Sequence, residues 1–301
     1  MKTRMSPMAK REERYFYLCI SPWIAGFLIF TAGPIVASLF FSFCNYDVVT
    51  PPNWVGIQNY KRLISDPLFW QSLKVTSYFS LVSVPLGIAL SLIIAILLNQ
   101  NIKGLTWFRT IYYMPSVISG VAVALLWMWI FNPEFGVLNF LLWKLFHIQG
   151  PAWLMSEEWV IPALIIMSLW GIGGDIVIYL AGLQGIPTEL YEAAEIDGAN
   201  SFNKFLNITI PMMSPVLLFT LIMGIINSFQ VFTQAYVMTR GGPHYASLFY
   251  VLYIYQNAFQ FFSMGYASAL SWILFLIILA LTFLIFKSSP LWVYYESTRE
   301  R

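Results

Sequence analysis

Charged residues are scarce in this sequence. Only 10% of its 301 residues are Asp, Glu, Lys or Arg, whereas 59% are hydrophobic and 18% are aromatic. An average soluble domain carries roughly a quarter charged residues, so a water-soluble globule of this length could not cover its surface with so few charges. Lipid is therefore expected to be the main solvent of this chain.

Cysteine and excess positive charge are also lacking. The two cysteines, Cys19 and Cys44, are too few for a disulfide scaffold or a cysteine-rich metal site. The 16 Lys and Arg nearly balance the 14 Asp and Glu, which gives no polybasic signature of nucleic-acid binding. His147 and His244 fall in separate predicted loops without the spacing of zinc ligands. We therefore expect neither a bound metal nor a nucleic-acid partner.

Six apolar runs are long enough to cross a bilayer, whose core of about 30 Å needs about 20 residues in a helix. The runs lie at 17–43, 76–98, 111–131, 160–184, 212–235 and 267–286. The first run is too long for the apolar part of a signal peptide, and no small-residue cleavage site follows it, so we expect it to be retained. The sequence predicts an all-α integral membrane domain of six helices over 17–286, flanked by segments 1–16 and 287–301.

The basic residues predict how these spans are oriented. If the N-terminus is cytoplasmic, 11 of the 16 Lys and Arg lie on the cytoplasmic side and 5 on the outer side, as the positive-inside rule requires. The inner set is Lys2, Arg4, Lys10, Arg11, Arg14, Lys103, Arg109, Lys204, Lys287, Arg299 and Arg301. The outer set is Lys61, Arg62, Lys74, Lys144 and Arg240. Both terminal segments are then cytoplasmic, and lipid surrounds the spans.

One predicted cytoplasmic loop, 185–211, runs against this charge bias. Its charged residues are Glu189, Glu192, Glu195, Asp197 and Lys204. Pro187 suits the first position of a helix, and Gly198 suits the left-handed residue that ends one. Asn200 or Ser201 can cap a second short helix that stops before Pro211. The loop therefore predicts a helix–turn–helix with an acidic face.

The second helix of this loop would expose an apolar stripe. Phe202, Phe205 and Leu206 fall on one side of it at helical spacing. An ordinary solvated hairpin is the simpler interpretation, but exposed aromatic side chains favour a partner surface that covers them.

The same loop also carries a family resemblance. Glu192-Ala193-Ala194 is followed after three residues by Gly198, and after nine more by an Ile-x-Ile-Pro sequence that ends at Pro211. This pattern resembles the EAA loop in permease subunits of binding-protein-dependent ABC importers, with Ile210 where the family prefers Leu. Three flanking segments resemble the MalF/UgpA-like sugar permeases in particular. These segments are 54–60, 180–187 and 241–243, and the resemblance runs over most of 15–290.

The resemblance implies a type I ABC importer permease with a cytoplasmic EAA coupling hairpin, in a bacterial inner membrane. Such a subunit translocates a sugar or oligosaccharide that an extracytoplasmic binding protein delivers. It pairs with a second homologous permease as a heterodimer, and a dimer of separate ATP-binding subunits drives it. The family positions that would contact the ATPase are Glu192, Ala193, Ala194, Asp197, Gly198 and Pro211.

The expected division of labour leaves no catalysis on this chain. ATP and Mg²⁺ would be bound by the partner ATPase, so the chain itself would need no cofactor. The sequence agrees, because no G-x-x-x-x-G-K-[ST] phosphate loop occurs in it. We therefore expect that the chain is not an enzyme.

Asp175 is the one acidic residue inside a predicted span. An ionisable group at that depth is costly unless it faces a cavity or a partner, so a place on the substrate pathway is the first interpretation and a hydrogen bond between helices is the second. The glycines at 171, 173 and 174 would let a helix or a ligand approach closely. We include Gly171 with Asp175 among the pathway candidates.

The fifth predicted span adds a polar stripe. Asn227, Gln230 and Gln234 follow the i, i+3, i+7 spacing of one helix face, and Ser228 lies beside them. Polar groups in lipid turn toward a partner helix or a wet cavity. Amides and hydroxyls with nearby aromatic rings suit a polyhydroxylated sugar, although simple helix packing is an alternative.

Three competing functions remain open from the sequence. A permease for a polyol or glycerol phosphate fits the same motifs. An ion-coupled secondary transporter would show inverted repeats and more buried ionisable groups. A membrane enzyme would need clustered His, Asp or Glu near an interface. Neither pattern is visible in the sequence.

Overall fold

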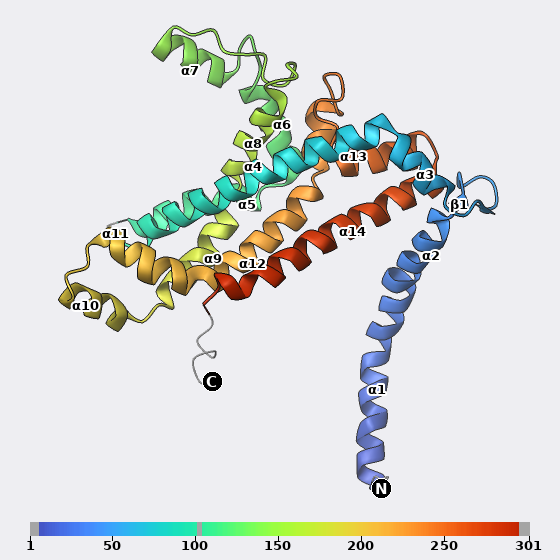
Figure 1. The fold of residues 1–301 in the computed structure, drawn as a ribbon, viewed down its shortest axis with the longest axis horizontal. Coiled ribbons are helices and arrows are strands. Elements are labelled where there is room, and N and C mark those ends of the chain that lie inside the picture. The colour runs from blue at the N-terminus through green and yellow to red at the C-terminus, as the bar shows by residue number, and fades with distance from the viewer. Residues whose placement is uncertain (1–5, 101–103, 295–301) are drawn as a thin grey trace. The chain divides into compact units, whose positions relative to one another are not determined.

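The computed structural model describes residues 6–100 and 104–294 (Figure 1). Two compact units divide the chain, one formed by Met1–Ser65 with Ile254–Ile273 and the other by Asp66–Tyr253 with Leu274–Arg301. Several predicted features lie outside the described residues. They are the outermost parts of segments 1–16 and 287–301 and the cations Lys2, Arg4, Lys103, Arg299 and Arg301.

The first unit begins with one long apolar helical run of 36 residues. It consists of α1 (Pro7–Phe27), a π-helical turn (Leu28–Ala32) and α2 (Gly33–Ser42). The run starts earlier than the predicted residue 17, because the Ser6 side chain accepts a hydrogen bond from the Ala9 N–H at 3.2 Å and Pro7 occupies the first turn.

A short two-stranded sheet and a helix follow the first span. It comprises β1 (Cys44–Asn45), β2 (Asn53–Trp54) and α3 (Gln58–Ser65). The strands pair antiparallel with Cys44 opposite Trp54. The Asn59 side-chain amide donates to the backbone oxygens of Ser42 and Cys44, each at 2.9 Å. The segment 54–60 therefore fastens the strand pair to the end of α2.

The second unit opens with α4 (Pro67–Leu98), a helix of 32 residues. It starts nine residues before the predicted residue 76. The Asp66 carboxylate accepts a hydrogen bond from the Leu68 N–H at 2.9 Å, and Pro67 occupies the first turn. Both are ordinary helix-start signals, so local capping sets this boundary rather than the edge of the apolar run.

Two predicted spans are broken. The third consists of α5 (Leu105–Val117) and α6 (Gly120–Ile130), bent by 102°, and the fourth of α8 (Val160–Trp170) and α9 (Gly173–Gln184), bent by 48°. The first break lies at Ile118 and Ser119, whose ψ angles of 141° and 134° are extended. The described residues hold four helices able to span a membrane, or six if each bent pair is one span. The predicted helical membrane architecture is thus confirmed with four to six apolar spans, and the third and fourth predicted spans are not continuous helices.

The remaining elements complete the two units. They are α7 (Val137–Phe146), α10 (Thr188–Ile196), α11 (Ser201–Lys204), π-helical turns at Phe205–Thr209, Ala235–Thr239 and Gln256–Gln260, α12 (Ile210–Phe229), α13 (Tyr250–Tyr255), α14 (Met264–Ser288) and a 3₁₀ turn at Ser289–Leu291. The helical run from Ser201 reaches Phe229 without a gap.

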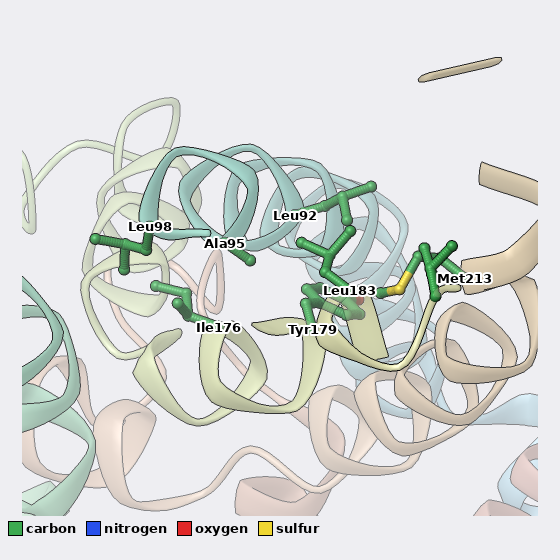
Figure 2. Packing of buried hydrophobic residues seen from close by; sticks show 8 residues of the cluster. Leu92, Ala95, Leu98, Ile176, Tyr179, Leu183 and Met213 are labelled. Carbon is green, nitrogen blue, oxygen red and sulfur yellow. The ribbon is translucent and has the colours of Figure 1, made fainter. Parts of the chain in front are cut away.

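A buried apolar cluster joins α4, α9 and α12 in the second unit (Figure 2). Its buried members are Leu92, Ala95, Leu98, Ile176, Tyr179, Leu183, Ile186 and Met213. Packing is close at Gly182, where an added Cβ would lie 2.9 Å from the Met213 sulfur. Because lipid is as apolar as these side chains, such tight fitting rather than the hydrophobic effect holds the helices together.

Candidate functional site

A cavity of about 270 Å³ lies among α4, α8, α9 and α12 in the second unit. Its polar lining residues are Ser83, Ser168, Asp175, Thr220, Asn227, Ser228 and Gln234. The predicted pathway residues Asp175, Asn227, Ser228 and Gln234 are therefore brought together, although they come from separate stretches of the chain. The predicted residues Gly171 and Gln230 do not line this cavity.

Asp175 enters the cavity from the break in the fourth span. It is the third residue of α9, directly after the bend at Gly171 and Ile172. The free N–H groups and the dipole at a helix start stabilise a carboxylate placed there. Within the part of the chain that the structure describes, no side chain donates a hydrogen bond or forms an ion pair with this carboxylate. Its acceptor oxygens are therefore available to a ligand or a partner.

The amide stripe forms differently from the prediction. The prediction that residues 227, 230 and 234 share one helix face is wrong. The helix α12 ends at Phe229, and Gln230 takes a non-helical φ of −105° and ψ of 16°. Gln234 lies beyond this break and still reaches the cavity. The predicted fifth span of 212–235 is accordingly replaced by a helix that ends six residues earlier.

Ser228 already has a partner within the protein. Its hydroxyl lies 2.6 Å from the Ser80 hydroxyl of α4 and also donates to the Ile225 backbone oxygen at 3.0 Å. Ser228 is buried. It therefore holds α12 against α4, while Asn227 and Gln234 carry the less restricted amides of the cavity.

Sequence reasoning missed Ser83, Ser168 and Thr220, which also line the cavity. Ser83 belongs to a row of small hydroxyl residues on α4 at spacings of three, four or eight. The row is Ser72, Thr76, Ser80, Ser83 and Ser91, and all five side chains are buried. This spacing was visible in the sequence as one helix face. Thr220 lies seven residues before Asn227 on α12, and its hydroxyl pairs with that of Tyr179 on α9.

The glycines at the break have distinct roles. An added Cβ at Gly173 would lie 2.3 Å from the Tyr112 backbone oxygen of α5, whereas one at Gly174 would meet nothing within 4 Å. Gly171 ends α8. The predicted close helix approach therefore occurs at Gly173.

The second feature is the acidic hairpin, residues 185–211. Its first helix ends as predicted, with Gly198 at φ +77°. The Gly198 N–H donates to the Glu195 oxygen at 3.0 Å, and the Ala199 N–H donates to the Ala194 oxygen at 2.8 Å. These two bonds form a Schellman cap, which requires the left-handed residue that glycine supplies at least strain.

The second arm of the acidic hairpin departs from the prediction. Asn200 is its cap, accepting from the Asn203 N–H at 2.8 Å. The arm does not stop before Pro211. A π-helical turn at Phe205–Thr209, closed by the Ile210 N–H on the Phe205 oxygen, carries it into α12. The wider turn accommodates a proline that lacks an N–H. At the other end Pro187 precedes the first helix, which begins at Thr188.

The two arms are joined by side-chain bonds. Lys204 Nζ lies 2.6 Å from Glu195 Oε1, and this hydrogen bond keeps the pKa of the exposed Glu195 carboxyl below its ordinary value. The Tyr191 and Thr209 hydroxyls lie 3.0 Å apart. The hairpin is thus a fixed unit rather than a loose loop.

The acidic hairpin exposes both acidic and apolar side chains. Glu192, Ala193 and Asp197 are exposed. Ile196 is 87% and Phe202 65% exposed. Of the predicted apolar stripe, Phe202 and Leu206 are exposed and Phe205 is partly covered. Among residues 6–100 and 104–294, no three His, Cys, Asp or Glu side chains come together as a metal site.

Comparisons with known proteins identify the family of this chain. Residues 87–289 match the family described as binding-protein-dependent transport system inner membrane component. The probable ABC transporter permease protein YesP of Bacillus subtilis is 44% identical over 301 residues, covering 99% of this chain and 97% of that protein. The trehalose/maltose transport system permease protein MalF of Thermococcus litoralis is 34% identical, covering 94% and 96%.

A solved structure agrees with the sequence relatives. The crystal structure of a bacterial ABC transporter involved in the import of the acidic polysaccharide alginate matches with a TM-score of 0.82 and 25% identity, covering 93% of this chain and 96% of that one. The resemblance to MalF/UgpA-like permeases is thereby confirmed. The chain belongs to the binding-protein-dependent family of inner membrane transport components and is a multi-pass, type I permease subunit of an ABC importer, which is not itself an enzyme.

Proposed function

We propose that this permease translocates a sugar or oligosaccharide, and that the cavity among α4, α8, α9 and α12 is part of the pathway. The observation that carries the proposal is the gathering of Asp175, Asn227 and Gln234 around one cavity in a largely apolar unit. Carboxylate and amide groups offer both acceptors and donors to the hydroxyls of a sugar. The name of the trehalose/maltose permease MalF supports the same solute class.

Glycerol phosphate or another polyol is the second candidate. A phosphate would favour a cationic partner. The described lining of the cavity includes one carboxylate and no Lys or Arg. A neutral polyhydroxylated solute therefore suits these residues better.

The acidic hairpin is the proposed contact with the ATPase. The exposed positions Glu192, Ala193 and Asp197, with Gly198 between the two arms and Pro211 where the second arm enters the span, match the EAA loop pattern. Ile196 and Phe202 supply exposed apolar area that a partner would cover. ATP and Mg²⁺ would be bound by that partner.

In this proposal the chain works with three protein partners in a lipid membrane. The protein partners are a dimer of ATP-binding subunits, a second homologous permease that forms a heterodimer with this chain, and an extracytoplasmic solute-binding protein. The 11 to 5 distribution of Lys and Arg supports cytoplasmic termini, which puts the acidic hairpin on the side where ATP is available.

The test compares two amides on either side of the helix end. The transporter, assembled with its partners in proteoliposomes, is given labelled maltose, trehalose, lactose and glycerol 3-phosphate in turn. Asn227→Leu should lower uptake about five- to thirtyfold, because losing a hydrogen bond and adding an apolar group to a polar cavity costs about 1–2 kcal/mol. Gln230→Leu is the matched control and should keep uptake, since Gln230 does not line the cavity.

The outcomes separate the alternatives. Equal uptake by both variants would remove the cavity from the pathway. Uptake of glycerol 3-phosphate alone by the wild type would replace the sugar with the second candidate.

A further inference from the structure

Two tyrosine–threonine hydroxyl pairs connect the α9–α10 segment to the helical run that ends in α12. The Tyr179 and Thr220 hydroxyls lie 2.6 Å apart, and the Tyr191 and Thr209 hydroxyls lie 3.0 Å apart. Tyr179 is fully buried, and Thr220 and Thr209 are nearly so. Hydroxyl bonds shielded from water in this way are costly to leave unmade.

The direction of the first bond follows from its surroundings. The Thr220 hydroxyl donates to the Val216 and Leu217 backbone oxygens, each at 3.1 Å. Its own proton is thus engaged, so Tyr179 is the donor to Thr220. At the second pair the Thr209 hydroxyl donates to the Lys204 backbone oxygen at 3.5 Å. Tyr191 is therefore the donor to Thr209.

The two pairs lie at two levels of one helical run. Thr209 and Thr220 are 11 residues apart, about 16 Å along a helix. Their tyrosine partners follow in the opposite order, so the α9–α10 segment runs antiparallel to α12. One attachment would leave a pivot, whereas two attachments at this separation fix the relative orientation of the segments.

The stretch between the pairs is tightly packed. Gly182 lets α9 approach Met213 and Val216, with an added Cβ 2.9 Å from the Met213 sulfur. Ile186, in the short link between α9 and α10, is buried in the same cluster, and Tyr191 packs against that cluster. The link therefore has little room to act as a hinge.

The pairs reach from the cavity to the hairpin. Thr220 lines the cavity, and Tyr179 lies one helical turn after Asp175. Tyr191 belongs to the first arm of the acidic hairpin. On the other side a groove of about 420 Å³ lies between the hairpin and the end of α4. The Tyr191–Thr209 pair ties the first arm of the hairpin to the helical run that continues into α12.

We propose that Tyr191–Thr209 and Tyr179–Thr220 are positioning pairs that make the acidic hairpin and the wall of the cavity move as one rigid body. This inference rests on the proposed function of the hairpin as the contact with the ATPase. Force applied at the hairpin then reaches Asp175 and Thr220 as a rotation of the whole segment, without bending at the link.

The first experiment measures rigidity directly and needs no sugar. Spin labels on Ile196→Cys, in the hairpin, and Val177→Cys, in α9, are placed in the assembled transporter after the exposed Cys19 is replaced by serine. Pulsed electron resonance should give the same distance distribution in the nucleotide-free and ATP-bound states. Tyr191→Phe should broaden it. A wild-type distance that changes with nucleotide would overturn the proposal.

The second experiment measures the consequence as sugar transported per ATP hydrolysed, with the sugar of the panel that the wild type takes up. Tyr191→Phe and Thr209→Val should each lower this ratio about two- to tenfold, the range that one such hydrogen bond contributes to an equilibrium. The double variant should be no worse than either single variant, because both remove the same bond. Thermal stability of each complex is recorded alongside.

Controls and outcomes keep this proposal separate from the proposed function. Tyr78→Phe, an exposed tyrosine of α4 without a hydrogen bond to another described residue, should leave the ratio unchanged. Additive losses in the double variant, or an unchanged ratio in both single variants, would overturn the rigid-body proposal. Failure of every panel sugar would instead refute the solute assignment, and the distance measurement would still decide the rigidity.

Discussion

At the residue scale, the chemistry of the site concentrates on Asp175. Its carboxylate combines a favourable helix start with an open cavity and no partner among the described residues. A helix N-terminus stabilises an anion by about 0.3–1 kcal/mol at the surface and up to about 2 when partly buried. This contribution offsets part of the cost of burying the carboxylate without a neighbouring cation, and Asp175 lines the cavity.

Two substitutions at this position separate charge from hydrogen bonding. Asp175→Asn should keep partial sugar uptake, because the amide retains one acceptor oxygen and a similar shape. Asp175→Leu should lower uptake about tenfold or more, since it removes every acceptor at that point of the cavity. Uptake in proteoliposomes is the measurement, with co-purified ATPase as the control for assembly.

Each alternative result has a definite meaning. Wild-type uptake by Asp175→Leu would assign the residue to packing alone. Loss by Asp175→Asn as complete as by Asp175→Leu would show that the negative charge itself is needed, which favours a charged solute.

At the element scale, the acidic hairpin depends on one backbone conformation. Gly198 lies at φ +77° and lets the two arms meet so that Lys204 reaches Glu195 and Tyr191 reaches Thr209. A non-glycine residue with a β-branched side chain is strained in this region by about 1–2 kcal/mol. The direction of the second arm, and hence the start of α12, is therefore tied to this residue.

Gly198→Val is expected to leave the protein in the membrane but to lower co-purification of the ATPase and sugar-stimulated ATP hydrolysis. The reason is that the strained turn misdirects the exposed face that bears Glu192. Gly198→Asn is the matched control, since Asn tolerates the left-handed conformation, and it should retain most of both signals. Normal coupling in Gly198→Val would argue against the hairpin as the ATPase contact.

At the scale of the whole molecule, the chain is built to be part of an assembly. It has permease relatives along almost its full length, an exposed acidic and apolar hairpin, and no phosphate loop. Its spans include two bent pairs, a feature that membranes tolerate where the broken backbone lies in protein or lines a cavity. In the proposed function, other subunits therefore supply the energy and deliver the solute.

The purified chain alone should show no ATP hydrolysis above the background of an empty-vector preparation. Co-expression with its ATP-binding subunits and second permease should yield a complex whose hydrolysis rises when the binding protein and its sugar are added. ATP hydrolysis is measured in the same detergent for both preparations. Robust hydrolysis by the isolated chain would contradict this division of labour.

Local chemistry made much of this protein predictable from its sequence. Composition alone requires lipid as the solvent, and apolar runs of bilayer length give the six-span pattern. The left-handed Gly198 and the capping by Asn200 follow from rules that act within a few residues. The family resemblance also rested on short motifs, of which Gly198 is one.

Tertiary structure decided where the helices break and what meets at the cavity. The bend after Ile118, the end of α12 at Phe229 and the place of Gln234 at the cavity do not follow from the apolar runs. Ser83 and Thr220 become cavity residues only because α4, α9 and α12 pack together. The physical reason is that apolar periodicity sets length and solvent, whereas close packing between helices in lipid sets their angles and their contacts.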